Sequence, residues 1–144
     1  MQRTAQAVWN GSGLEGTGTL TTLSGALKDQ PYSAKLRFVD EHGADGTNPE
    51  ELIAAAHAGC FTMALSFQLT NAGHVPTQLR TKAVLTMEKQ DIGWTITAIV
   101  LKVEGTVPGV DAAKFAELAG NAKAGCPISR ALAVPITMEA TLTA

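Results

Sequence analysis

The N-terminal part of the chain alternates between polar and apolar residues with a period of two, which is the pattern of β-strands. In the run TGTLTTLSG, threonines occupy alternate positions. In the run AKLRFV, Leu36 and Phe38 share one face of an extended chain, and Arg37 lies on the opposite face. Residues 1–46 are therefore predicted to form about three strands, arranged roughly as a β-meander.

A long helix is predicted next. Thr47 or Asn48 can cap its N-terminus, and Pro49 suits the first helical position. Gly73 is a natural stop, so the helix has about 24 residues. After Glu51 it contains no Asp, Glu, Lys or Arg.

A helix that is apolar all round is either buried or spans a membrane. His57, Gln68 and several hydroxyl side chains interrupt the apolar run, and no basic flank would orient it in a bilayer. A central helix buried in the protein is therefore predicted, and not a membrane span.

Two strands follow the helix. Residues 78–88 and 94–107 alternate in polarity, and the turn 90–93 joins them. Pro108 and Gly109 end the second strand.

The C-terminal part is predicted to contain two helices and a strand. Asp111 caps a helix that ends at Gly125, Pro127 opens the short helix PISRAL, and the tail PITMEATLT alternates again. The predicted order is βββ–α–ββ–αα–β, which is an α+β fold. No linker divides the chain, so one domain over residues 1–144 is expected.

Composition and charge exclude several classes of protein. Charged residues make up 17% of the chain and its formal net charge is −2, so no strong field would attract phosphate or anionic lipid. Lys and Arg are scattered, which argues against nucleic-acid binding. The N-terminus lacks a secretory signal pattern, so a cytoplasmic location is expected.

The two cysteines, Cys60 and Cys126, are the main candidates for chemistry. In a reducing compartment they are either two inert buried thiols or a working redox pair. Cys126 lies at a predicted helix start, where backbone amides favour a thiolate, whereas Cys60 lies within a helix. Cys60 would need a cationic side chain, for which Arg37 is a candidate.

His57 precedes Cys60 by three residues, so both share a helix face. The pair could form a His–Cys dyad, as in a hydrolase, or half of a metal site for which only His42 and His74 remain as further histidines. A buried histidine without either role is the simplest alternative.

Two segments resemble a known family. The segment TNPEELIAAAHAGCFTMA (47–64) and the segment KAGCPIS (123–129) are similar to those of the osmotically inducible protein C/organic hydroperoxide resistance (OsmC/Ohr) family. The form AAHAGC and the position of Arg37 resemble the OsmC branch.

The resemblance implies a thiol peroxidase that reduces organic hydroperoxides and, less well, hydrogen peroxide. It implies that Cys60 is the peroxidatic cysteine, that Cys126 resolves it as an intramolecular disulfide, and that Arg37 and Glu50 activate the thiol. It also implies an intertwined homodimer with no bound cofactor or metal. The expected reductant is an external dithiol of the dihydrolipoyl type, carried on a lipoylated protein.

Three apolar residues near Cys60 could receive an alkyl chain: Phe61, Met63 and Phe67. The alternative is that they belong to the core. A non-enzymatic hydroperoxide sensor or a small-lipid binder that uses the same apolar helix remains the alternative function.

Glu50 and Cys60 cannot meet within one straight helix, because ten residues separate them by about 15 Å along the axis and about 80° around it. If both serve one site, either the helix is broken or Glu50 comes from another chain. A two-fold axis near Ala55 would bring Glu50 of each chain towards Cys60 of the other.

Overall fold

The computed structural model describes residues 1–40 and 45–143. The chain forms two compact units, Met1–Leu52 and Ile53–Ala144. The expectation of one domain over residues 1–144 stays a prediction. The helices and strands, in chain order, are β1 (Ala5–Asn10), β2 (Thr17–Thr22), β3 (Gln30–Ser33), α1 (Ala34–Phe38), α2 (Pro49–Asn71), β4 (Gln78–Gln90), β5 (Gly93–Thr106), α3 (Ala112–Gly125), α4 (Pro127–Ala131) and β6 (Ile136–Thr143).

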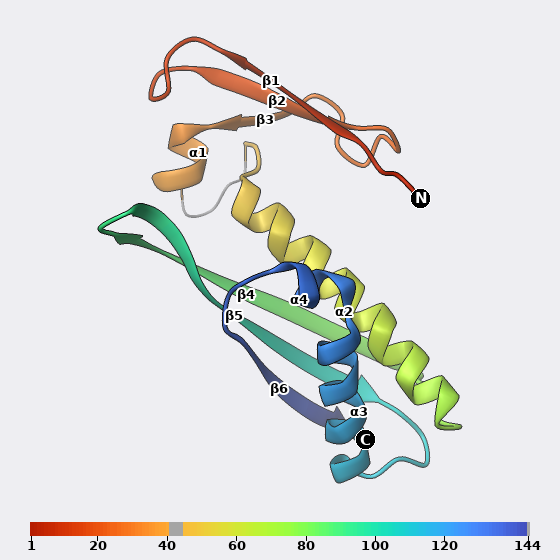
Figure 1. Cartoon of the computed structure of the whole chain (residues 1–144). Coiled ribbons are helices and arrows are strands. Elements are labelled where there is room, and N and C mark those ends of the chain that lie inside the picture. The colour runs from red at the N-terminus through yellow and green to blue at the C-terminus, as the bar shows by residue number, and fades with distance from the viewer. Residues whose placement is uncertain (41–44, 144) are drawn as a thin grey trace. The chain divides into compact units, whose positions relative to one another are not determined.

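The first unit is built on an antiparallel sheet in the order β1–β2–β3 (Figure 1). Gly18 in β2 lies opposite both Trp9 and Tyr32. A Cβ atom at Gly18 would collide with the Tyr32 ring and with the Val8 carbonyl, so only glycine fits there. The Trp9 and Tyr32 rings consequently pack with their centroids 5.2 Å apart.

The run AKLRFV is not a strand, and this part of the prediction was wrong. Strand β3 ends at Ser33, and α1 begins at the next residue. The Ser33 hydroxyl oxygen caps α1 by accepting a hydrogen bond from the Leu36 N–H at 3.2 Å. Ala, Lys, Leu and Arg are also good helix formers, so cap and propensity together outweigh the short alternation. Arg37 therefore lies in the last turn of a helix and not on a strand.

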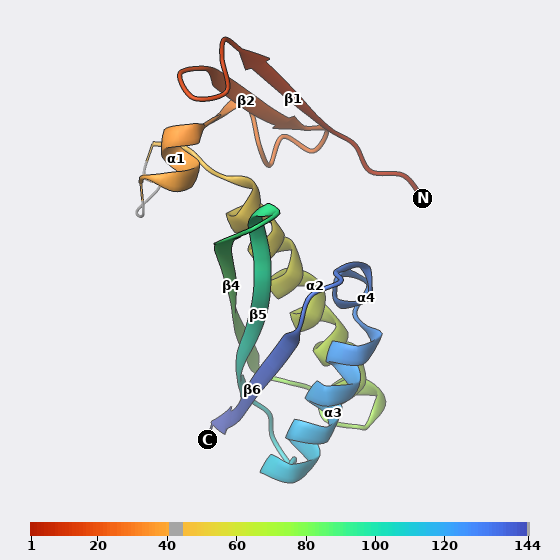
Figure 2. The same cartoon turned by 60° about the vertical axis from the view of Figure 1, so that its left-hand side comes forward.

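The second unit contains a sheet in the order β4–β5–β6. Strands β4 and β5 form the predicted hairpin, in which Gly93 adopts a φ of 115° directly after the turn. Strand β6 pairs in parallel with β5, so α3 and α4 belong to the crossover between them. The helices α3 and α4 lie on one side of this sheet (Figure 2). The α+β prediction is confirmed.

Helix α2 has 23 residues without a break. The Asn48 side chain caps it by accepting a hydrogen bond from the Glu51 N–H at 2.8 Å, and Gly73 has a φ of 87° at its end. By length and composition alone α2 could cross a membrane, a test that core helices of soluble proteins also pass.

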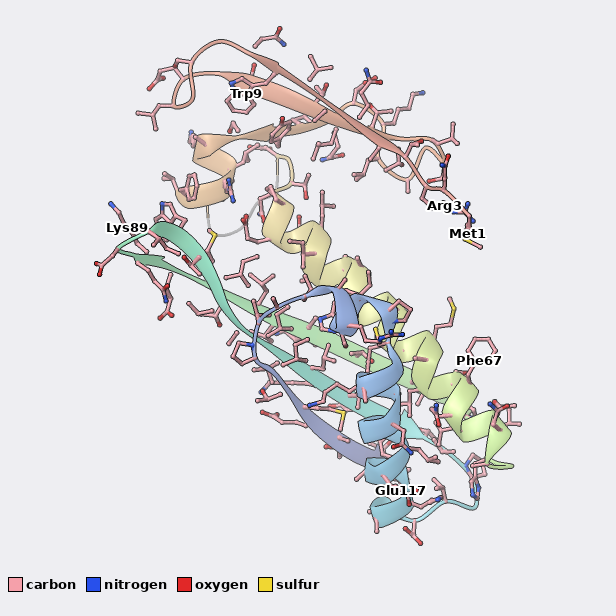
Figure 3. All side chains as sticks on the ribbon, viewed as in Figure 1. Met1, Arg3, Trp9, Phe67, Lys89 and Glu117 are labelled. Carbon is pink, nitrogen blue, oxygen red and sulfur yellow. The ribbon has the colours of Figure 1, made fainter. Side chains whose placement is uncertain are left out.

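Only one stripe of α2 is buried. His57, Phe61, Leu65 and Leu69 recur every four residues and face the core. Phe67 is 64% exposed and projects from α2 away from the sheet (Figure 3). The expectation of a helix buried all round is therefore not met within this chain.

The core of the second unit lies between its sheet and its helices. Three fully or almost fully buried side chains of β5 pack in one cluster with those of α2 and α3: Ile99, Leu101 and Val103. Phe115 and Leu118 are the large α3 side chains in the cluster. The four alternating apolar residues of β6 pack against it as predicted: Ile136, Met138, Ala140 and Leu142.

Candidate active site

The fold brings the two cysteines together although 66 residues separate them. The Cys60 and Cys126 sulfur atoms lie 3.0 Å apart and share a hydrogen bond. Both cysteines are free thiols. Cys126 is completely buried, whereas Cys60 is partly exposed. The thiol pair expected from the sequence is thus present in its reduced form.

Cys126 is held between two helices. It ends α3 by donating its N–H to the Ala122 carbonyl at 2.9 Å, and it begins α4 by accepting from the Arg130 N–H at 3.0 Å. Gly125 and Pro127 flank it, and its extended backbone, with a φ of −61° and a ψ of 121°, turns the chain between the helices. The sulfur is therefore fixed by backbone contacts on both sides.

The two thiols differ in acidity. Burial raises the pKa of Cys126. The hydrogen bond with Cys60 and those from the N–H and hydroxyl of Ser129 and the Ile128 N–H together lower it by more, so that the pKa lies below its usual value. Burial and the hydrogen bond with Cys126 raise the pKa of Cys60, against a smaller opposing effect of the Ile128 N–H. Cys126 is therefore the more acidic thiol of this pair, as its place at a helix start suggests.

His57 does not pair with Cys60. Its Nε2 lies 2.7 Å from the Ser129 hydroxyl oxygen, and its side chain is completely buried. Its Nδ1 is buried without a hydrogen-bond partner in the described part of the chain. Burial lowers the pKa of His57, which keeps the ring neutral. The His–Cys dyad considered for a hydrolase is therefore not formed.

No group of three or more His, Cys, Asp or Glu side chains that could hold a metal ion occurs among residues 1–40 and 45–143. His42 lies outside the described residues.

Arg37 and Glu50 form an ion pair in the first unit. Arg37 Nη2 lies 2.6 Å from Glu50 Oε1, and Arg37 Nε donates to both carboxylate oxygens at 3.2 and 3.1 Å. The guanidinium also lies over the Phe38 ring, 5.0 Å from its centroid. The two residues that the family resemblance singles out thus meet, and their action on a thiol stays a proposal.

The three candidate pocket residues lie in different environments. Phe61 is fully buried in the core, whereas Met63 and Phe67 are each 64% exposed. Met63 lines an open groove of about 610 Å³ together with Gly59 and Thr62. Exposed apolar surface is therefore present on α2, but Phe61 serves as core.

The sequence analysis did not single out Ser129 or the aromatic surroundings of Arg37. Ser129 stands three residues after Cys126, the spacing at which a side chain in the first helical turn reaches the cap residue. Trp9, Tyr32 and Phe38 line a cavity of about 120 Å³ with Arg37. That cavity depends on cross-strand pairing, which spacing along the chain does not show.

A mixed α+β fold that carries two free thiols in hydrogen-bonding contact defines a class of protein with a dithiol site. Comparison with known sequences identifies a family within this class. Residues 42–141 match the OsmC-like protein family. "Peroxiredoxin OsmC" of Escherichia coli (strain K12) is 48% identical over 139 residues, covering 96% of this chain and 95% of the relative. "Organic hydroperoxide resistance protein OhrA" of Bacillus subtilis (strain 168) is 33% identical over 120 residues, covering 81% and 78%.

Solved structures agree with this result. The organic hydroperoxide resistance protein OhrB of Bacillus subtilis has a TM-score of 0.70 at 26% identity, over 97% of this chain and 98% of that one. An OsmC-like protein from Mycoplasma pneumoniae has the same fold, with a TM-score of 0.79 at 16% identity over 100% and 99% of the two chains. The chain belongs to the OsmC-like protein family.

Proposed function

We propose that this chain is a thiol-dependent peroxidase that reduces organic hydroperoxides to alcohols. The observation that carries the proposal is the reduced pair Cys60 and Cys126, with sulfur atoms 3.0 Å apart. The sequence relatives, a peroxiredoxin and organic hydroperoxide resistance proteins, support the same chemistry.

The proposed reaction uses both thiols. The Cys60 thiolate attacks the distal oxygen of the hydroperoxide, the O–O bond breaks, and the alcohol leaves after taking up a proton. Cys60 is then a sulfenic acid. Cys126 Sγ attacks the Cys60 sulfur, a disulfide forms and water leaves. An external dithiol reduces the disulfide to the two thiols.

We assign the first step to Cys60, because it is the more accessible of the two thiols. Cys126 is the more acidic thiol, but it is completely buried and cannot be reached by a peroxide. Cys60 is partly exposed. A low pKa also suits Cys126 for its own roles, because a more acidic thiol leaves faster when the disulfide is reduced.

The raised pKa of Cys60 means that the reduced pair needs a cation to form the peroxidatic thiolate. We assign this role to Arg37, held by Glu50. Since α2 is unbroken between Glu50 and Cys60, we assign the pair to the partner chain of a homodimer, with two equivalent sites.

The apolar surface of α2 suits an organic substrate. Met63 and Phe67 are exposed, and Met63 borders a groove along α2 that Gly59 and Thr62 also line. An alkyl or aryl group that covers this surface would favour organic hydroperoxides over hydrogen peroxide. The proposed reductant is a dihydrolipoyl-type dithiol on a lipoylated protein, in the cytoplasm, with no bound cofactor.

One titration tests the proposal. The reduced protein receives one equivalent of cumene hydroperoxide, free thiols are counted, and dihydrolipoamide is then added in excess with more peroxide. We expect both thiols to disappear, to return with the dithiol and to support repeated turnover. Loss of thiols without turnover would instead indicate a sensor. An unchanged thiol count would reject the redox function and leave a small-lipid binder.

A further inference from the structure

A buried hydrogen-bond chain leads from His57 to Cys126. His57 Nε2 lies 2.7 Å from Ser129 Oγ, across 72 residues of sequence. Ser129 stands three residues after Cys126, in the first turn of α4, and a hydrogen bond from its hydroxyl contributes to the lowered pKa of Cys126, whose sulfur lies 3.0 Å from that of Cys60. His57 and Cys126 are both completely buried. The proposed peroxidase reaction has so far assigned no role to His57 or Ser129.

The surroundings of His57 determine which atom donates each hydrogen in this series of hydrogen bonds. A neutral imidazole carries one hydrogen, on either Nδ1 or Nε2. Nδ1 has no partner in the described residues, and a buried N–H without an acceptor is rarer than an unpaired acceptor. The hydrogen therefore belongs on Nε2, which donates to Ser129 Oγ. The Ser129 hydroxyl is then free to donate its own hydrogen to Cys126 Sγ.

We propose that His57 is a positioning residue that acts through Ser129 to hold the Cys126 sulfur ready for disulfide formation. The inference rests on the proposed function, because it concerns the resolving step. In that step Cys126 Sγ attacks the Cys60 sulfenic sulfur, the S–S bond forms and the S–O bond breaks. The departing hydroxide takes up the proton that Cys126 has given up and leaves as water, while Ser129 and His57 keep their hydrogens.

The kinetic test separates the two steps of thiol oxidation. His57→Leu and Ser129→Ala are mixed rapidly with one equivalent of cumene hydroperoxide. Sulfenic acid formation at Cys60 should keep its wild-type rate, and disulfide formation should slow about tenfold, as expected for a lost hydrogen bond to a charged group. The double variant should be no slower than the slower single variant, because both changes break one chain.

Two further variants serve as controls. Arg130→Gln, at the next exposed position of α4, should leave both steps unchanged. His57→Gln retains an N–H donor near the Nε2 position and should recover most of the lost rate. Equal slowing in His57→Gln and His57→Leu would overturn the inference, because it would show a packing role only.

Two measurements do not depend on peroxidase activity. The ultraviolet absorbance of the Cys126 thiolate is measured at a fixed pH in reduced Cys60→Ser protein. It should be lower when the same chain also carries Ser129→Ala or His57→Leu. Nitrogen NMR of the His57 ring should place the hydrogen on Nε2. A hydrogen on Nδ1, or an unchanged thiolate absorbance, would reject the role of His57 even if the protein proves to be a peroxidase. If the wild-type protein consumes no peroxide, the proposed function fails. These two measurements still decide whether His57 acts on Cys126 through Ser129.

Discussion

Arg37 binds the Glu50 carboxylate through two of its nitrogen atoms, with Nη2 2.6 Å from Oε1 and Nε within 3.2 Å of both oxygens. An ammonium group cannot reproduce this planar geometry. We therefore expect Arg37→Lys to lower kcat/KM for cumene hydroperoxide roughly ten- to hundredfold, the effect of losing a hydrogen bond to a charged group. Arg130→Lys is the control. Near wild-type turnover in Arg37→Lys would show that charge alone suffices.

Replacing each of the two cysteines should affect peroxide reduction in a different way. Cys60→Ser should abolish peroxide reduction, because it removes the accessible sulfur. Cys126→Ser should allow one rapid oxidation and then stall, because no thiol remains to resolve the sulfenic acid. Stopped-flow peroxide consumption and trapping of sulfenic acid measure both. The opposite result would mean that the more acidic thiol, Cys126, reacts first.

If each site uses Glu50 of one chain and Cys60 of another, two inactive variants should complement each other. Cys60→Ser and Glu50→Gln, refolded together, should recover partial activity, because each heterodimer holds one complete site. Activity is measured against each variant refolded alone. An inactive mixture in which heterodimers are shown to form would reject the shared site.

Glu51→Gln is the matched control for Glu50→Gln. The Glu51 carboxylate accepts a hydrogen bond from the Thr47 hydroxyl at 2.7 Å, which a glutamine carbonyl oxygen can also accept. Glu51 also points about 100° away from Glu50 around the helix. We expect the activity of Glu51→Gln to remain close to wild type. A loss of activity equal to that of Glu50→Gln would indicate damage to the start of α2.

The buried His57 should make the protein sensitive to acid. Because burial lowers its pKa below 6.5, the unfolded chain binds a proton more readily than the folded chain. Stability is therefore full above about pH 6.5 and falls as the pH decreases towards the folded-state pKa. Urea midpoints at several pH values should show a smaller loss in His57→Gln than in the wild type. His74→Gln controls for the removal of a histidine. If His57→Gln and His74→Gln lose the same stability on acidification, this account is contradicted.

Oxidation should change the stability of the fold. A Cys60–Cys126 disulfide closes a loop whose ends are 66 residues apart. The loss of chain entropy in the unfolded state then corresponds to about 4 kcal/mol of stabilisation. Denaturant unfolding of the oxidised protein should therefore require more urea than that of the reduced protein. The Cys126→Ser variant, treated with the same peroxide, should show no such increase.

The sequence predicted the helices and strands of the second unit because their signals are local. Asp111 caps α3 with a 2.7 Å hydrogen bond from the Lys114 N–H, Asn48 caps α2, and Gly93 permits the hairpin turn. These features require only neighbouring residues. The spacing of the two cysteines alone left two inert thiols and a redox pair as alternatives. The segments that resemble the OsmC/Ohr family favoured the redox pair.

Other features depend on contacts that a single sequence does not display. The alternation in AKLRFV resembles a strand, and one Ser33 hydroxyl changes the outcome to a helix. The His57–Ser129 contact joins residues 72 positions apart. The apolar character of α2 shows that much of it should be covered, but the sequence does not show which stripe this chain buries.

The parallel pairing of β5 and β6 has a consequence for the folding chain. Cys126 lies in the crossover between these strands, so its sulfur reaches Cys60 only when long-range pairing is complete. Until then Cys60 has no neighbouring thiol. An oxidant that meets an unfolded or newly made chain would carry Cys60 past the sulfenic acid to the irreversible sulfinic acid. In the proposed reaction, the same oxidant converts a folded molecule to a disulfide that an external dithiol reduces, whereas it permanently inactivates an immature chain. The speed of folding then limits how many active molecules survive oxidative stress.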